Sequence, residues 1–324
     1  MFEFLINKLK AHPRRIVFTE GTDARILEAA ARLLSGNFLT PVLVGNPEEV
    51  MAAAEKAGFN IRGAEIIDPA NFDDMDKMVD EMVTLRKGKM TADECRVTLL
   101  QANYFGTMLV KMGYADALLG GATYSTADTV RPALQLVKTK PQNQIVSSCF
   151  IMVRPSATGD NEVLAMGDCA INIKPNEDEL VEIALETAKT AKTFGIDPKV
   201  AFLSYSTKGS GKGEDVDKVR NACAKAKQLA PELALDGEMQ FDAAVSPHVG
   251  QLKFPGSPVA GHANTFIFPD INAGNIGYKI AQRLGNFDAY GPILQGLNAP
   301  INDLSRGCNA EEVYKMAIIT AGMA

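Results

Sequence analysis

The sequence contains no tryptophan, and among its 324 residues are only three histidines and five cysteines. The histidines are far apart and form no HExxH pattern, and no two cysteines have the CxxC spacing of a zinc site. We therefore expect no protein-held metal. The odd number of cysteines also argues against a disulfide framework.

Positive charge is not in excess, and long apolar runs are missing. The formal net charge of −6 excludes a general nucleic-acid-binding surface. No apolar run approaches the roughly 18 residues of a membrane helix, and the apolar stretch at residues 2–6 is interrupted by Glu3, too short for a secretory signal. We expect a cytoplasmic protein without membrane or nucleic-acid partners, in which local Arg and Lys residues bind any anionic substrate.

What the sequence does contain is an alternation of apolar strands and amphipathic helices. Residues 15–19 and 115–121 predict buried strands, and the segments between the predicted strands have helical apolar spacing. This alternation predicts an α/β fold with a parallel sheet covered by helices on both faces. After a polar, proline-containing linker at 138–144, the apolar runs 145–153 and 163–173 predict an antiparallel hairpin that begins a second domain.

A short polar stretch before the last predicted helix combines groups that bind anions. Asn309 is a good N-cap, and Glu312 stands at capping-box spacing from it. Ser305 and Arg306 precede the cap, where a helix N-terminus offers unpaired N–H groups and partial positive charge. An arginine adds a two-point grip on phosphate or carboxylate. The same residues also fit an ordinary cap beside a surface ion pair.

A second polar stretch follows the predicted strand at 115–121. Glycines after a strand let the backbone approach a ligand closely, and ligands of open parallel sheets collect at the carboxyl ends of strands. Ser125 and Asp128 have the spacing of another capping box, and Arg131 lies in the first turns of the helix. A βα turn with good caps and no ligand is the equally open alternative.

Residues 206–213 look like a phosphate-binding loop but depart from that pattern at both ends. A Walker A motif requires glycine where this chain has Ser206, and serine or threonine where it has Gly213. We interpret this segment as a mobile surface loop or lid, basic enough to contact an anionic ligand.

Three longer motifs, at residues 125–134, 269–279 and 302–309, are similar to those of the phosphotransacetylase (phosphate acetyltransferase) family, and the resemblance extends over essentially the whole chain. It implies two α/β domains with mainly parallel sheets, like isocitrate and isopropylmalate dehydrogenases, and a cleft between them. It further implies a homodimer and an acyltransferase that moves acetyl groups reversibly between acetyl phosphate and CoA.

The resemblance also assigns parts of the chain to the two domains. Residues 1–141 plus 296–324 are predicted to form domain I, which carries the C-terminal catalytic turn. Residues 142–295 are predicted to form domain II, which contains the hairpin and forms the dimer contact.

Individual roles follow from the same resemblance. Ser305 and Arg306 match the family's catalytic pair, and Glu312 stands where the family usually has aspartate, with Glu311 as the reserve candidate for the base. The residues predicted to bind substrate are Ser125, Thr126, Thr129, Arg131, Arg86, Asn272 and Lys279.

The chemistry of the reaction agrees with these roles. The CoA thiol attacks as a thiolate, a carboxylate takes its proton, and Arg306 with Ser305 stabilises negative charge on the carbonyl oxygen and the departing phosphate. Acetyl phosphate, CoA and inorganic phosphate are the expected partners, and CoA or acetyl-CoA is a substrate rather than a permanently bound cofactor. A helix N-terminus lowers the pKa of a carboxylate, which weakens it as a base, whereas burial raises that pKa again. We therefore expect the domains to close around the substrate and bury the carboxylate.

Several alternatives stay open. Cys308 is a rival nucleophile that would form an acyl-enzyme. One alternative is an acyltransferase for a longer acyl group, such as butyryl, instead of acetyl. Another is a non-catalytic regulatory module that binds acyl-CoA. A decarboxylating dehydrogenase on the same fold requires clustered aspartate ligands and a nucleotide site, which the sequence lacks.

Overall fold

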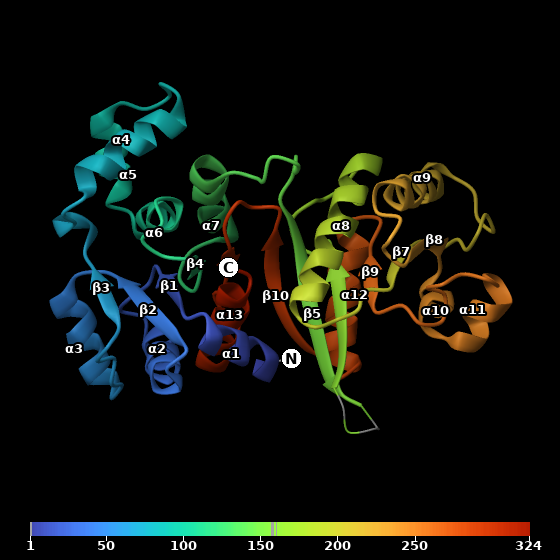
Figure 1. The fold of residues 1–324 in the computed structure, drawn as a ribbon, viewed down its shortest axis with the longest axis horizontal. Coiled ribbons are helices and arrows are strands. Elements are labelled where there is room, and N and C mark those ends of the chain that lie inside the picture. Colours follow the sequence, from blue (N-terminus) through green and yellow to red (C-terminus); the bar gives the residue numbers. More distant parts are fainter. Residues whose placement is uncertain (1, 157–158, 160) are drawn as a thin grey trace. The chain divides into compact units, whose positions relative to one another are not determined.

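The computed structural model describes residues 2–156, 159 and 161–324 of the chain (Figure 1). The chain forms two compact units, of which unit 1 comprises Met1–Lys140 and Leu297–Ala324 and unit 2 comprises Pro141–Gly296. Residues 157, 158 and 160 of the predicted hairpin connection lie outside the described residues.

Unit 1 is built on a five-stranded parallel sheet in the order β11-β4-β1-β2-β3. Its strands are β1 (Arg14–Phe18), β2 (Leu39–Val44), β3 (Glu65–Ile67), β4 (Ala117–Gly120) and β11 (Ile301–Asp303). The strand β11 belongs to the C-terminal segment, so the chain returns to this sheet after completing unit 2. The parallel sheet predicted from the alternating pattern is confirmed.

Helices cover both faces of the unit 1 sheet, with α6 on one side and α2 and α13 on the other (Figure 1). The helix α2 begins after the N-cap Asp23, buries Ile26, Leu27 and Leu33 on one stripe, and ends at Asn37 in the left-handed conformation. The helices of unit 1 are α1 (Phe2–Ala11), α2 (Ala24–Gly36), α3 (Pro47–Ala57), α4 (Met75–Arg86), α5 (Ala92–Leu99), α6 (Ala102–Lys111), α7 (Thr126–Pro132) and α13 (Ala310–Gly322), with a 3₁₀ turn at Pro69–Asn71 and a π turn at Ala133–Val137.

Unit 2 contains a six-stranded mixed sheet in the order β10-β5-β6-β9-β7-β8. The strands are β5 (Ser147–Pro155), β6 (Asn161–Gly167), β7 (Val200–Leu203), β8 (Leu235–Met239), β9 (Thr265–Ile267) and β10 (Asp288–Gln295). The pairs β10–β5 and β5–β6 are antiparallel, whereas β6–β9, β9–β7 and β7–β8 are parallel. The β5–β6 pair is the predicted hairpin.

Two hydrophobic layers enclose the unit 2 sheet because side chains alternate along each strand. On β7, Val200 and Phe202 pack with α8 and α9, while Ala201 and Leu203 pack in the layer that contains residues of α10 and α12. The helices of unit 2 are α8 (Glu177–Thr193), α9 (Glu214–Leu229), α10 (Phe241–Val245), α11 (Pro247–Lys253) and α12 (Ile271–Leu284).

One predicted strand is shorter than its apolar pattern suggested. The run at 163–173 leaves the sheet after Gly167, because the buried carboxylate of Asp168 accepts hydrogen bonds from the backbone N–H groups of Ala170, Ile171 and Asn172. A side chain that binds the following backbone competes with the strand ladder and turns the chain.

No described helix combines the length and the apolar character that crossing a membrane requires. Likewise, the described residues contain no cluster of His, Cys, Asp or Glu side chains suited to hold a metal ion.

Candidate active site

The C-terminal turn, residues 304–309, connects β11 to α13 at the carboxyl edge of the unit 1 sheet. Its cap is the predicted capping box: the Glu312 N–H donates to Asn309 Oδ1 at 2.9 Å, and the Asn309 N–H donates to Glu312 Oε2 at 3.1 Å. Within the turn, the Cys308 N–H donates to Ser305 O at 2.9 Å. Ser305, Arg306 and Glu312 are all exposed, so a hydroxyl, a guanidinium and a carboxylate are presented from one helix start.

Arg25, at the start of α2, ties this turn to the rest of unit 1. Its Nη1 donates to Arg306 O at 2.9 Å and to Cys308 O at 3.1 Å, and its Nη2 donates to Ala122 O at 3.0 Å. Sequence reasoning did not identify Arg25, because 281 residues separate it from Arg306 and its local signal is only that of an early helical position.

The glycine-rich loop after β4 is organised around Glu20. Glu20 Oε1 accepts hydrogen bonds from the N–H groups of Gly121 at 3.0 Å and Thr123 at 3.2 Å, and Oε2 accepts one from the Thr19 hydroxyl at 2.8 Å. Burial raises the pKa of the Glu20 carboxyl above its ordinary value, against the opposing effect of these hydrogen bonds. The loop conformation therefore depends on a half-buried acid that the sequence pattern did not reveal.

A second acid, the buried Asp303 of β11, joins the loop to the C-terminal segment. Its two carboxylate oxygens accept hydrogen bonds from Thr126 Oγ1 and Thr129 Oγ1, each at 2.6 Å. Burial raises the Asp303 pKa. Gly121 lies directly over this carboxylate at φ +100°, where a Cβ would come within 2.3 Å of Asp303 Oδ1. Here glycine lets the backbone approach a side chain of the protein itself.

Asp128, in the first turn of α7, lies near two arginines, Arg131 and Arg306. Its carboxylate accepts from the Ser125 hydroxyl at 2.6 Å and from the Ser125 N–H at 3.3 Å, which is the predicted capping interaction. These hydrogen bonds lower the Asp128 pKa, and Arg131 and Arg306 contribute in the same direction through their charge. Arg131 is exposed, with Nη1 3.9 Å from Asp128. The loop and the C-terminal turn thus bring Arg131 and Arg306 near the same carboxylate on one surface of unit 1.

The two candidate bases differ in their partners. Glu311 forms ion pairs with Arg32 at 2.6 Å and Lys315 at 3.4 Å, and the Arg32 hydrogen bond chiefly lowers the Glu311 pKa. Glu312 makes the cap hydrogen bond through one carboxylate oxygen. A paired carboxylate is a weaker proton acceptor, so the contacts favour Glu312.

The rival nucleophile Cys308 is buried at 6% exposure. Burial raises its pKa, although the Arg25 guanidinium, 3.7 Å from Sγ, acts in the opposite direction. A thiol held in its neutral form is a poor nucleophile, which disfavours a covalent acyl-enzyme.

The remaining predicted substrate residues lie outside this surface or beneath it. Thr129 is buried, and its hydroxyl donates a hydrogen bond to Asp303. Arg86 ends α4, and its Nε has no hydrogen-bond partner among the described residues. Asn272 and Lys279 are exposed residues of α12 in unit 2, where Lys279 Nζ donates to the nearby Asn275 Oδ1 at 2.8 Å.

The loop at 206–213 has a defined conformation built on the buried Glu238 of β8. Glu238 Oε1 accepts from the Gly209 N–H at 2.7 Å and from the Ser206 hydroxyl at 3.0 Å, and Ser206 Oγ accepts from the Gly211 N–H at 2.8 Å. These N–H groups are therefore engaged within the protein. A phosphate cradle needs such groups pointing at the ligand, so this loop lacks the defining feature of one.

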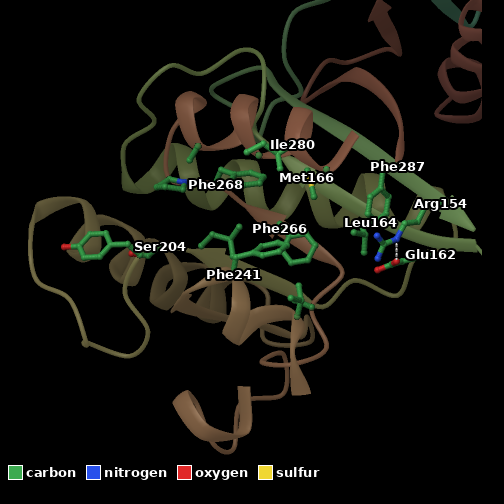
Figure 2. A pocket seen from close by; sticks show the side chains of 18 residues that line it. Arg154, Glu162, Leu164, Met166, Ser204, Phe241, Phe266, Phe268, Ile280 and Phe287 are labelled. Atoms are coloured by element: carbon green, nitrogen blue, oxygen red, sulfur yellow. Dashed lines mark hydrogen bonds and ion pairs between the residues drawn. The ribbon is translucent and has the colours of Figure 1, made fainter. Parts of the chain in front are cut away.

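Unit 2 also contains an apolar cavity of about 640 Å³ (Figure 2). Figure 2 shows Phe241 and Phe266 facing it on one side, Phe268 and Ile280 on another, and the Arg154–Glu162 ion pair at one end. Few polar groups converge there, so the cavity is not suited to bind an acyl phosphate.

Comparison with known proteins gives consistent results. The family described as "Phosphate acetyl/butaryl transferase" matches residues 1–321. The phosphate acetyltransferase of Bacillus subtilis (strain 168) is 52% identical over 324 residues, covering 100% of this chain and 99% of the relative. A solved phosphotransacetylase from Streptococcus pyogenes is 56% identical with a TM-score of 0.95, covering 99% of this chain and 97% of that chain. A branched-chain phosphotransacylase from Enterococcus faecalis V583, 20% identical with a TM-score of 0.67 and covering 95% and 99% of the two chains, shares the fold.

Proposed function

Because the chain belongs to the phosphate acetyl/butaryl transferase family and acts as a phosphate acetyltransferase, we propose that acetyl transfer takes place at the C-terminal turn of unit 1. In this reaction the CoA thiolate attacks the carbonyl carbon of acetyl phosphate, and inorganic phosphate leaves. The observation that carries this assignment is the joint exposure of Ser305, Arg306 and Glu312 at one helix start.

Arg306 and Ser305 act on the negative charge that develops in the reaction. The guanidinium binds the phosphate group and offsets charge on the carbonyl oxygen, and the Ser305 hydroxyl donates a hydrogen bond to the same group. From the neighbouring loop, the exposed Arg131 and Thr126 and the half-buried Ser125 bind the phosphate. To donate to it, the Ser125 and Thr126 hydroxyls give up their hydrogen bonds to Asp128 and Asp303. Thr129 contributes to the substrate site indirectly, because its buried hydroxyl holds the Asp303 carboxylate in place.

Glu312 is the general base that takes the thiol proton. Among the described residues, only its Oε2 makes the cap hydrogen bond, so Oε1 is available for the proton. Glu311 stays paired with Arg32 and keeps the helix docked on α2.

The part of CoA remote from its thiol binds residues farther from the turn. Arg86, with its unpartnered Nε, and the exposed Asn272 and Lys279 of α12 are proposed CoA contacts. The catalytic turn itself is carried by domain I. CoA is a substrate here, and no permanently bound cofactor enters the reaction.

The proposed partner in solution is a second copy of the chain, which contacts unit 2. On α12, Ile276, Ile280 and Leu284 are spaced four residues apart and are 58%, 54% and 80% exposed. They adjoin the apolar cavity of Figure 2, whose lining includes Ile280. An apolar patch of this kind is typical of a homodimer interface. Light scattering after size exclusion tests it: a dimer that Ile280→Asp converts to a monomer supports it, and a wild-type monomer contradicts it. We place this homodimer in the cytoplasm.

A thiol-release assay tests the function directly. Acetyl-CoA with phosphate or arsenate should be consumed with release of the free CoA thiol, at a rate that depends on both substrates. In the reverse direction, acetyl phosphate and CoA should give acetyl-CoA and phosphate. Absence of CoA-dependent turnover would leave only the binding-module alternative. The ratio of kcat/KM for acetyl phosphate and butyryl phosphate decides between the two acyl groups, and we expect acetyl to be preferred.

Cys308→Ala separates direct attack from an acyl-enzyme. Turnover near the wild-type rate, with initial rates that indicate a ternary complex, supports direct attack. Complete loss of turnover with ping-pong kinetics in the wild type would contradict it.

A further inference from the structure

The contacts of Arg25 have no role in the reaction as described so far. We propose that Arg25 is a positioning residue for acetyl transfer, which fixes the turn carrying Arg306 at a set distance from the glycine-rich loop after β4. This inference rests on the proposed acetyltransferase function. It concerns the backbone to which the catalytic side chains are attached, rather than contact with the substrate.

The guanidinium of Arg25 is itself held in place by Asp23, the N-cap residue of α2. Arg25 Nε donates to Asp23 Oδ1 at 2.9 Å, Nη2 donates to Asp23 Oδ2 at 2.7 Å, and the Arg25 N–H donates to Asp23 Oδ1 at 2.9 Å. The side-chain hydrogen bond from Arg25 holds the Asp23 pKa below its ordinary value. Two-point contact with an ionised carboxylate fixes the plane of the guanidinium.

The remaining N–H groups of Arg25 reach three backbone carbonyls from two segments. Nη1 binds Arg306 O and Cys308 O, on either side of Gly307, at 2.9 and 3.1 Å. Nη2 binds Ala122 O at 3.0 Å, next to Gly121. One rigid, planar group therefore links residues 306–308 of the turn to the loop, in a way that a lysine ammonium does not reproduce. It adds to the links made nearby by Asp303 and by the Leu304 N–H, which donates to Gly120 O at 2.7 Å.

The turn needs such an external support because its own contacts are few. Ser305, Arg306 and Gly307 are exposed, and a side chain at Gly307 would meet only Ser305 Oγ, at 3.8 Å. Among described contacts within the turn, the Cys308 N–H binds Ser305 O and the Gly307 N–H binds Ser305 Oγ at 3.3 Å. Without Arg25, we expect the Arg306 backbone to shift by about an ångström. A displacement of that size at a reacting group lowers the rate about 10²-fold.

The charge of Arg25 is already paired with Asp23, which argues against a direct role in binding anionic substrate. Loss of Arg25 is therefore expected to lower kcat more than it raises KM for acetyl phosphate. This pattern is that of an interaction needed in the transition state.

The first experiment compares Arg25→Ala with Arg25→Lys and with Arg32→Ala as a matched control. Arg32 also lies on α2, and its described contacts are to Glu311 and the ring of Tyr314 on α13 rather than to the turn. We expect about a 10²-fold lower kcat in Arg25→Ala, most of this loss in Arg25→Lys, and nearly normal kcat in Arg32→Ala. Full activity in Arg25→Lys would overturn the inference, because charge alone would then suffice.

The second experiment is a double-mutant cycle with Arg306→Ala. If Arg25 acts by placing Arg306, removing it should have little further effect on kcat once Arg306 is gone. Losses that multiply would show that Arg25 acts independently and would overturn the inference. Addition of guanidinium at millimolar concentration to Arg25→Ala should restore kcat with saturation, and the absence of any recovery in a folded variant would contradict the positioning role.

These outcomes separate the inference from the function on which it rests. A wild-type protein without acetyl transfer contradicts the proposed function. An active wild type whose Arg25→Ala variant keeps full kcat contradicts only the role of Arg25.

Discussion

Two glycine-rich loops, one in each unit, are both built on a glutamate, which is half-buried in unit 1 and buried in unit 2. In unit 1 the loop after β4 binds Glu20 through the N–H groups of Gly121 and Thr123. In unit 2 the loop at 206–213 binds Glu238 through the Gly209 N–H and the Ser206 hydroxyl. In both cases, backbone groups that an unbound loop offers to an anion are occupied by a carboxylate of the protein.

The two loops differ in the residues that lie beside them. Beside the unit 1 loop, Ser125 and Thr126 begin α7, and the guanidinium groups of Arg131 and Arg306 both act on Asp128. In unit 2 one of the two lysines of the loop, Lys208, lies over the ring of Phe254 at 5.0 Å. Glycines and positive charges in a sequence therefore do not by themselves make an anion site. A second segment must bring cations to the same edge, as the C-terminal turn does in unit 1.

The largest effect on kcat should come from Arg306→Lys, which keeps the positive charge but removes the planar guanidinium that makes a two-point contact. We expect kcat to fall by about 10²–10³-fold, the size seen on removing a donor to a developing oxyanion. Steady-state kinetics with acetyl phosphate and CoA measure it. Unchanged kcat would show that the catalytic cation lies elsewhere and would break the comparison.

Glu312→Gln should have the next largest effect. Glutamine preserves the cap to Asn309 but cannot take a proton, so kcat should fall by about 10²-fold and lose the pH dependence that a general base imposes. Glu311→Gln is the matched control in the same first turn of α13 and should leave kcat nearly unchanged, because Glu311 is paired with Arg32. The reverse result for the two glutamates would assign the base to Glu311.

Glu20→Gln tests the role of the unit 1 glutamate through the pH dependence of the free energy of unfolding. The Glu20 pKa is raised from 4.5 by burial, so the folded state binds this proton more tightly than the unfolded chain. Wild-type unfolding free energy therefore decreases as pH rises from 4.5 to the folded pKa. The variant lacks this titration, so its stability relative to wild type should increase through that window and then level off. Urea unfolding midpoints across the pH range measure it, and a constant difference would contradict it.

The smallest effect is expected in unit 2. Lys208→Ala and Lys212→Ala should each change kcat/KM by less than about two-fold, as surface substitutions usually do. A loss of more than ten-fold in either variant would make the unit 2 loop part of the anion site and would remove the contrast between the two loops.

The sequence predicted those features that depend on neighbours within a few residues. The capping boxes of Ser125 with Asp128 and of Asn309 with Glu312 are confirmed, because an N-cap bonds to the turn that follows it. The parallel sheet of unit 1 was predictable for a similar reason, since apolar runs and helical spacing are local signals. The strand β8 was not predicted, because its buried Asp236 and Glu238 interrupt the apolar pattern.

The supports of the candidate site were outside the reach of local reasoning. Thr126 and Asp303 are 177 residues apart in the chain, and Arg25 and Arg306 are 281 residues apart. Their partnerships exist only because β11 joins the sheet beside β4 and α13 packs on α2. The sequence by itself determined which side chains with the right chemistry stand at the helix starts. Only the tertiary structure decided which acids and which arginine hold them in place, because those contacts form when distant segments meet at one edge of a sheet.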